Sequence, residues 1–297
     1  MVETSIGKRP VVVGIGEILW DLLPSGKQLG GAVTNFAYHA QALGAEGIVA
    51  SCVGKDALGQ EILQRLDSLH LTRQYIALHP QLPTGTVEVR VDEKGIPDFI
   101  IHQNVAWDAI PTSEDLLALA ARADAVCFGS LAQRAQTSRE TIRRFLAGLR
   151  KQCLRVFDIN LRQSYFTRDI VHESLAIADV LKLNDQELPA LGKLLQLKGT
   201  ASDLLAQLMR QYPLRMIALT RGGQGSQLFA DRRVFEHPGY LTTVVDTVGA
   251  GDAFTAALTI GLLRKDDPAK INDSANRLAS YVCSQPGATP PIPKKLP

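Results

Sequence analysis

The sequence predicts an α/β protein with a central, mostly parallel sheet that helices cover on both faces, and with a small β-sheet lid. Short continuous apolar runs alternate along the chain with amphipathic helical segments. One stretch instead alternates apolar and polar residues with a period of two, as a sheet with one wet face does. A length of 297 residues allows one domain, residues 1–297, with a large core.

Six apolar runs are the candidate strands of the main sheet, and their continuity is typical of strands covered on both faces. They are residues 11–16, 48–53, 125–129, 154–160, 180–184 and 216–220. Helical patterns lie between them, at residues 36–43, after Asp56, and in a segment that Ser138 is expected to cap. This alternation predicts a doubly wound domain.

The period-two stretch covers residues 84–91, where Val87, Val89 and Val91 alternate with charged residues. Residues 92–95 are expected to form a turn, and residues 99–102 the returning strand of a small antiparallel sheet. The lid is expected to comprise about 17–31 and 83–108. Exposed edge strands invite pairing, so we expect a homodimer through this lid.

The composition excludes several function classes. Lys and Arg (32) nearly balance Asp and Glu (30), so the net charge of +2 argues against nucleic acid or a membrane surface as partner. The apolar runs are far shorter than the ~20 residues that cross a bilayer, and the N-terminus lacks a signal-peptide pattern. The four cysteines lack CxxC spacing, which predicts free thiols and a cytoplasmic location.

The strongest chemical signal is the segment Asp246-Thr-Val-Gly-Ala-Gly-Asp252, which leads into a helical run. At a helix start, the backbone N–H groups of Gly249, Ala250 and Gly251 form an anion site together with the helix dipole. A carboxylate at residue 252 would repel a bound phosphate. It suits a site where it takes a proton from an attacking hydroxyl while the amides hold the transferred phosphoryl group.

A second segment suits the binding of hydroxyl groups. The first strand runs into Asp21, and Gly30-Gly31 precedes Asn35 at an expected helix start. Carboxylates and amides hydrogen-bond vicinal hydroxyls, and glycines let a sugar approach the backbone. A plain turn and a plain helix N-cap explain the same residues, so both interpretations stay open. A dinucleotide fingerprint is disfavoured because Leu19 stands where its last glycine belongs.

Together these segments resemble the PfkB, or ribokinase-like, family of carbohydrate kinases. The resemblance rests on the Gly-Gly and Asn35 segment, on Val53-Gly-Lys-Asp-Ala-Leu-Gly59 and on residues 246–252, and it extends from about residue 11 to 288. It implies a ribokinase-like fold and ATP-dependent phosphorylation of a sugar CH2–OH. Residues 83–89, 102–108 and 128–134 most resemble bacterial fructokinases of the family.

The resemblance also implies residue roles. Asp252 matches the general base, and the amides of residues 249–251 match the anion hole, with Arg162 beside the triphosphate. Sugar contacts are expected from Asp21, Gly30, Gly31, Asn35, Gln133 and Asn104, and nucleotide contacts from Asn184, Thr220, Gly222, Gly225 and Asn276. Glu187 would organise Mg²⁺ through water. Some relatives hold K⁺, and the matching positions are Asp246, Val248, Val282 and Gly287.

Alternatives stay open beside several of these roles. Arg162 could form a surface ion pair, Gln133 could be a surface amide, and Asn276 could lie on a solvated helix face. Trp20 and Trp107 would either cover a sugar ring or fill the core.

The sequence thus predicts a kinase that takes ATP and a sugar, with D-fructose as the expected substrate. Ribose, 2-keto-3-deoxygluconate and a nucleoside stay open as substrates; a keto-deoxy acid would need a cation such as Arg90 or Arg134. A sugar- or nucleotide-binding sensor is the non-kinase alternative, against which the intact Asp252 argues. No G-x-x-x-x-G-K-[ST] sequence occurs, which excludes P-loop chemistry.

Overall fold

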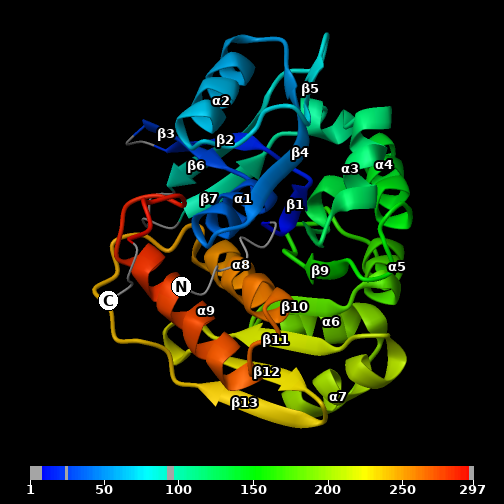
Figure 1. Cartoon of the computed structure of the whole chain (residues 1–297), viewed down its shortest axis with the longest axis vertical. Coiled ribbons are helices and arrows are strands. Elements are labelled where there is room, and N and C mark those ends of the chain that lie inside the picture. Colours follow the sequence, from blue (N-terminus) through cyan, green and yellow to red (C-terminus); the bar gives the residue numbers. More distant parts are fainter. Residues whose placement is uncertain (1–8, 24–25, 92–96, 294–297) are drawn as a thin grey trace, which may run out of the picture.

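The computed structural model describes residues 9–23, 26–91 and 97–293, which form a layered α/β body and a second, small sheet (Figure 1). The strands are β1 (Val11–Ile15), β2 (Leu19–Leu23), β3 (Gly26–Gly30), β4 (Glu46–Gly54), β5 (Ile76–His79), β6 (Gly85–Val91), β7 (Pro97–Ile101), β8 (Ala125–Phe128), β9 (Leu154–Asp158), β10 (Val180–Asn184), β11 (Met216–Thr220), β12 (Ser226–Ala230) and β13 (Arg233–His237). The helices are α1 (Ala32–Ala42), α2 (Ala57–Ser68), α3 (Glu114–Arg122), α4 (Gln136–Ala147), α5 (Arg168–Ile177), α6 (Glu187–Leu195), α7 (Ala201–Gln211), α8 (Ala250–Leu263) and α9 (Pro268–Cys283).

The main sheet has nine strands in the order β13-β12-β11-β10-β9-β8-β1-β4-β5. From β11 to β5 every neighbouring pair is parallel, whereas β12 and β13 run antiparallel. All six predicted strands belong to this sheet, so the predicted fold class is confirmed. Three further strands of this sheet were not predicted: β5, β12 and β13 are short strands toward its two edges, with partly exposed residues.

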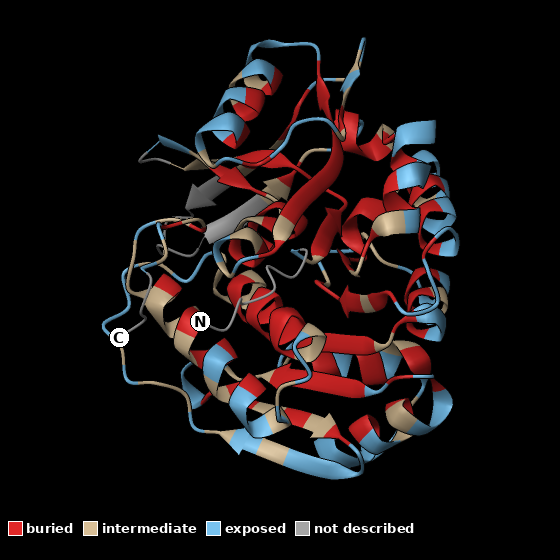
Figure 2. Ribbon diagram, in the orientation of Figure 1, coloured by how far each residue is buried: buried red, intermediate tan, exposed pale blue. Residues whose placement is uncertain are grey.

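Helices cover both faces of this sheet. On one face α1, α8 and α9 bury Phe36, Phe254 and Leu278 against the strands. On the other face α3 to α7 bury a second cluster that includes Ile142 and Leu208. The central strands are buried along their length, and exposure is concentrated on the outer sides of the helices and on β13 (Figure 2). No helix in the described ranges is long and apolar enough to cross a membrane.

The small sheet has the order β3-β2-β6-β7. The predicted β6–β7 hairpin is antiparallel, but β2 pairs in parallel with β6, so the sheet is mixed and not purely antiparallel. The predicted turn at residues 92–95 lies outside the described residues. Both tryptophans are buried: Trp20 Nε1 donates to the carbonyl of Leu58, and Trp107 packs under the guanidinium of Arg134. They therefore fill the core.

One helix start differs from the prediction. Helix α4 begins at Gln136 after Ala135, so Ser138 lies inside the helix instead of capping it. Its hydroxyl donates to the carbonyl of Trp107 and accepts from the N–H of Ile110. Ser138 therefore joins α4 to the segment that leads out of the lid.

Candidate active site

A cavity of about 1020 Å³ opens at the carboxyl ends of the parallel strands, where α/β sheets bind their ligands. Residues of β2 and β6 from the small sheet line it together with the loops after β1, β9, β10 and β11. Most of the predicted site residues line this one cavity: Asp21, Gly31, Asn35, Arg162, Asn184, Thr220, Gly222, Gly225, Val248, Gly249, Ala250, Gly251, Asp252 and Asn276. The topology thus brings together residues from both ends of the chain.

Helix α8 begins at the cavity, and none of the described side chains caps its N-terminus. Its N-cap, Gly249, has a φ of 78°, and a Cβ there would lie only 2.6 Å from the Cβ of Ala288, so glycine is required. The N–H of Ala250 makes a long bond, 3.4 Å, to the carbonyl of Thr247. The N–H groups of Gly251 and Asp252 donate to none of the described residues. Open amides at the positive end of a helix dipole suit the binding of an anion.

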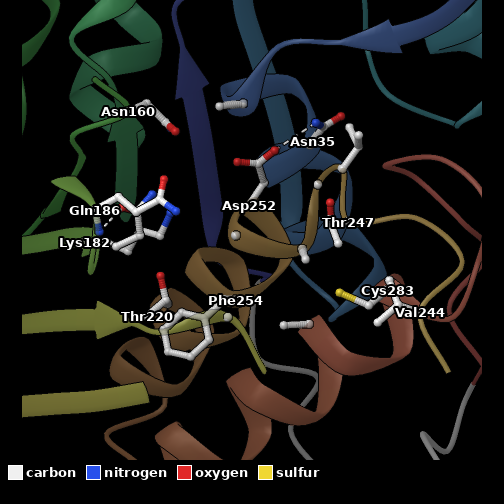
Figure 3. A pocket seen from close by; sticks show the side chains of 18 of the residues that line it. Asn35, Asn160, Lys182, Gln186, Thr220, Val244, Thr247, Asp252, Phe254 and Cys283 are labelled. Carbon is white, nitrogen blue, oxygen red and sulfur yellow. Dashed lines mark hydrogen bonds between the residues drawn. The ribbon is translucent and has the colours of Figure 1, made fainter. Parts of the chain in front are cut away.

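Asp252 stands in the first turn of α8, and Asn35 faces it from α1 (Figure 3). Asn35 Nδ2 donates to Asp252 Oδ2 at 2.8 Å. Asn35 lies inside α1, after the N-cap Gly31. Of the two interpretations that the sequence allowed, the plain helix N-cap is therefore excluded. The bond holds the carboxylate by one oxygen. The other oxygen has no protein donor among the described residues, so a substrate hydroxyl can approach it.

Three of the carboxyl groups that line the cavity, those of Glu17, Asp21 and Asp252, have raised pKa values. Burial, reinforced by the negative charge of Asp158, raises the pKa of Asp252 to about 6. Burial and the charge of Asp252 raise the pKa of Asp21 to about 6 and help to raise that of Glu17 to about 7. The positive charge of Arg162 lowers the pKa of all three. Groups tuned in this way can exchange protons near neutral pH.

On the lid side, the two glycines serve different purposes. Gly31 has a φ of 107°, and a Cβ there would lie 2.4 Å from the carbonyl oxygen of Glu17. The side chain of Glu17 in turn accepts a bond from the N–H of Ala32 at 3.3 Å. Gly30 does not line the cavity; a Cβ there would lie 2.3 Å from Asp21 Oδ2, so it leaves room for that carboxylate.

On the opposite side, Thr220, Gly222 and Gly225 line the cavity at the end of β11. Asn276 lines it from α9, where it is buried and donates to Ser226 Oγ at 2.7 Å, so it does not lie on a solvated helix face. Exposed apolar side chains of the loop before α8 flank this side: Leu241, Val244 and Val248. Apolar walls and backbone access suit a nucleotide base.

Arg162 and Glu187 act at the ends of β9 and β10. Arg162 lines the cavity and donates to Asn160 Oδ1 at 3.1 Å. It therefore does not form a surface ion pair, the alternative role that the sequence allowed. Glu187 is buried behind the cavity wall, and its two oxygens accept from the N–H groups of Leu161 and Asn184. Glu187 therefore fixes two loops of the site from behind.

Two predicted sugar contacts lie elsewhere. Gln133 is buried, and its amide donates to the carbonyl of Gly129 and to Ser174 Oγ, so it is neither at the cavity nor a surface amide. Its 3-10 turn points the side chain toward α5. Asn104 is exposed, has a φ of 56° and does not line the cavity. Neither Gln133 nor Asn104 therefore lines the cavity that holds most of the other predicted site residues.

The predicted cation positions form a junction beside the cavity. Asp246 accepts from the N–H groups of Val248 and Gly287, both at 3.0 Å, and so ties the loop before α8 to the loop after α9. Asp246, Val282 and Gly287 do not line the cavity. In the described part of the chain, no group of three or more His, Cys, Asp or Glu side chains is arranged to hold a metal ion.

Sequence reasoning missed a charged pair under α8. Lys182 Nζ lies 3.1 Å from Asp158 Oδ1, and Thr255 Oγ1 donates to Asp158 Oδ2 at 2.9 Å. Lys182 lines the cavity, whereas Asp158 does not. The signal was present, because a charge inside an otherwise apolar strand covered on both faces requires a partner.

The fold and the site define a class: enzymes that transfer a phosphoryl group to an alcohol, with a carboxylate beside an anion-binding helix. The model of the pfkB family carbohydrate kinases matches residues 25–295, and the chain belongs to that family.

Two curated relatives align with most of the chain. An uncharacterized sugar kinase of Pyrococcus horikoshii is 28% identical, covering 94% of this chain and 91% of the relative. The fructokinase of Klebsiella pneumoniae is 30% identical, covering 89% and 88%.

Solved structures have the same fold. The Pyrococcus protein in complex with ATP has a TM-score of 0.81 at 27% identity, with 94% of each chain covered. A Vibrio cholerae fructokinase variant with bound fructose, ADP and potassium has a TM-score of 0.79 at 23% identity, with 95% of each chain covered.

Proposed function

We propose that this carbohydrate kinase is a fructokinase, which converts ATP and D-fructose to ADP and fructose 6-phosphate. The observation that carries the proposal is the position of Asp252, in the first turn of α8 and in a cavity that extends from Asp21 to Thr220. One end thus offers hydroxyl-binding groups and the other a nucleotide site. The Klebsiella and Vibrio fructokinases support fructose as the sugar.

In the proposed reaction, the sugar CH2–OH oxygen attacks the terminal phosphorus of ATP, and Asp252 takes the hydroxyl proton. The bond from that phosphorus to the ADP oxygen breaks as the new bond forms. The open amides of Gly251 and Asp252 and the guanidinium of Arg162 stabilise the negative charge on the transferred group. Asn35 holds the Asp252 carboxylate for the proton transfer.

Magnesium would be held at this site mainly through phosphate oxygens and water, since Mg²⁺ keeps much of its hydration shell. It would neutralise phosphate charge when bound. Glu187 would support such an ion indirectly, because its carboxylate fixes the N–H groups of Leu161 and Asn184 at the cavity wall. Asn184 lines the cavity, and its Oδ1 accepts from the N–H of Glu187 at 2.8 Å.

A monovalent cation such as K⁺ would lie at the junction that Asp246 forms. Its carboxylate joins the loop of Val248 to that of Gly287, and backbone carbonyl oxygens are hard ligands of the type that such ions take. The ion would act by fixing the loop that begins α8.

One substrate alternative loses one of its two candidate ligands, Arg134. A 2-keto-3-deoxy acid requires a cation for its carboxylate, and Arg134 is already paired with Asp108 at 2.8 Å and 2.9 Å. Arg134 also covers the ring of Trp107, and its side chain is almost fully buried. The side chain of Arg90 lies outside the described residues.

The test is an ATP-coupled screen over fructose, ribose, 2-keto-3-deoxygluconate, tagatose and adenosine, with and without K⁺. We expect kcat/KM for fructose to exceed the values for the other substrates by about tenfold or more. A site arranged to hydrogen-bond the hydroxyls of one sugar discriminates strongly against analogues that lack them. A preference for ribose or the keto-deoxy acid would overturn the fructose assignment alone. Nucleotide and sugar binding without ADP release would instead indicate a sensor. Asp252→Asn is the negative control.

A further inference from the structure

Lys182 and Asp158 form a buried ion pair that reaches the floor of the site. Their backbones are paired in register on β10 and β9, and Lys182 Nζ lies 3.1 Å from Asp158 Oδ1. Only 5% of Lys182 is exposed, and Lys182 lines the cavity. The pair therefore connects the core of the main sheet to the place where the substrates meet.

The ammonium group lies against the first turn of α8. A Cβ at residue 251 would lie 3.0 Å from Lys182 Nζ, so the side chain occupies the space that Gly251 leaves free. An ammonium group has three N–H donors, and among the described residues only Asp158 accepts from this one. Asp158 is fully engaged, because its second oxygen accepts from Thr255. Lys182 therefore keeps donors for a ligand.

The ammonium group of Lys182 lies between opposing electrostatic influences. Cations are destabilised at the positive end of a helix dipole, and the open amides of Gly251 and Asp252 add to the positive potential. Burial lowers the pKa of Lys182, but the negative charges of Asp158, Glu187 and Asp252 outweigh it and raise that pKa above its usual value. The Lys182 side chain thus stays charged. Beside the open amides of Gly251 and Asp252, it can donate a hydrogen bond to a phosphate oxygen.

We propose that Lys182 contacts the transferred phosphoryl group and stabilises its charge. During transfer, the sugar oxygen bonds to phosphorus, the bond to the ADP oxygen breaks, and the hydroxyl proton goes to Asp252. Lys182 keeps its protons. This role rests on the kinase activity of the family and is independent of which sugar is used.

The experiment compares Lys182→Met, the double variant Lys182→Met/Asp158→Asn, and Lys193→Met as a control on the exposed side of α6. Calorimetry gives the affinities for AMP, ADP and the imido analogue of ATP, without sugar. Steady-state assays give kcat, and thermal unfolding gives Tm. The double variant is needed because Lys182→Met leaves Asp158 as a buried charge without its partner.

We expect both Lys182 variants to lose about 10² to 10³ in kcat, as loss of one transition-state donor does. They should bind the imido analogue about tenfold more weakly, while AMP affinity stays within about twofold. The double variant should recover the Tm lost in Lys182→Met but not the kcat. The control should match the wild type in all three measurements.

Recovery of kcat and analogue affinity together with Tm in the double variant would show that the pair is only structural and overturn the proposal. An equal loss of affinity for AMP would overturn it as well, because Lys182 would then support the whole nucleotide site. If no sugar in the screen is phosphorylated, the binding measurements still decide the role of Lys182.

Discussion

Asn35 and Asp252 lie 217 positions apart in the sequence, yet Asn35 Nδ2 donates to Asp252 Oδ2 at 2.8 Å. The bond joins α1, which follows the lid strand β3, to α8, whose first turn carries the open amides (Figure 3). It stabilises the ionised carboxylate and lowers its pKa, against burial, which raises it. Asn35 therefore sets both the position and the charge of the proposed base.

Asn35 variants should shift the pH dependence of catalysis. Asn35→Asp places a second negative charge beside Asp252, so the acid limb of kcat/KM should move upward by about one pH unit or more. Asn35→Ala removes the donor and should move it less. The measurement is a pH–rate profile with saturating ATP. Gln41→Asp, the same charge change farther along α1 and outside the cavity, should leave the limb in place; an unmoved limb in Asn35→Asp would contradict this role.

The wild type should lose activity as the pH falls through about 6. Asp252 must be ionised to accept a proton, and burial with the charge of Asp158 raises its pKa to about 6. Asp21 and Glu17 titrate close by, so the limb should be steeper than that of a single group. Circular dichroism at each pH is the control for folding. Full activity at pH 4.5 would show that the base has an ordinary pKa.

The fold could be predicted because it depends on local patterns. Continuous apolar runs mark β1, β8 and β10, and glycines mark the start of α8. The strands β12 and β13, at one end of the sheet, escaped detection because they are short and have partly or fully exposed residues in place of a continuous buried run.

The geometry of the site depends on contacts between distant segments, which the sequence alone does not specify. Asn35 could not be distinguished from a helix cap, because its role depends on how α1 packs against α8. Gln133 was misplaced because a short turn decides its direction. Lys182 was overlooked within an apolar strand, although its charge there was itself informative.

The stability of the protein should also report on Asp252. Its pKa is higher in the folded state than the 3.8 of an ordinary aspartate, so the folded state retains a proton that the unfolded chain releases. Its contribution to stability therefore falls as the pH rises from about 4 to about 6. Asp252→Asn removes this charge and should have a higher Tm than the wild type at pH 7 to 8, with a difference that shrinks toward pH 4. Calorimetry across this range tests it; a lower Tm for the variant at pH 8 would contradict the raised pKa.

The most direct measurement is a single-turnover transfer of the terminal phosphoryl group from labelled ATP to fructose, with excess enzyme, for the wild type and Asp252→Asn. General-base help contributes roughly 10² to 10⁴ in rate, so the variant should transfer the label that much more slowly. Its affinities for ATP and for fructose should stay within about threefold, because the amide keeps the shape of the carboxylate and its acceptor for Asn35. Transfer by the variant at nearly the wild-type rate would contradict the role of Asp252.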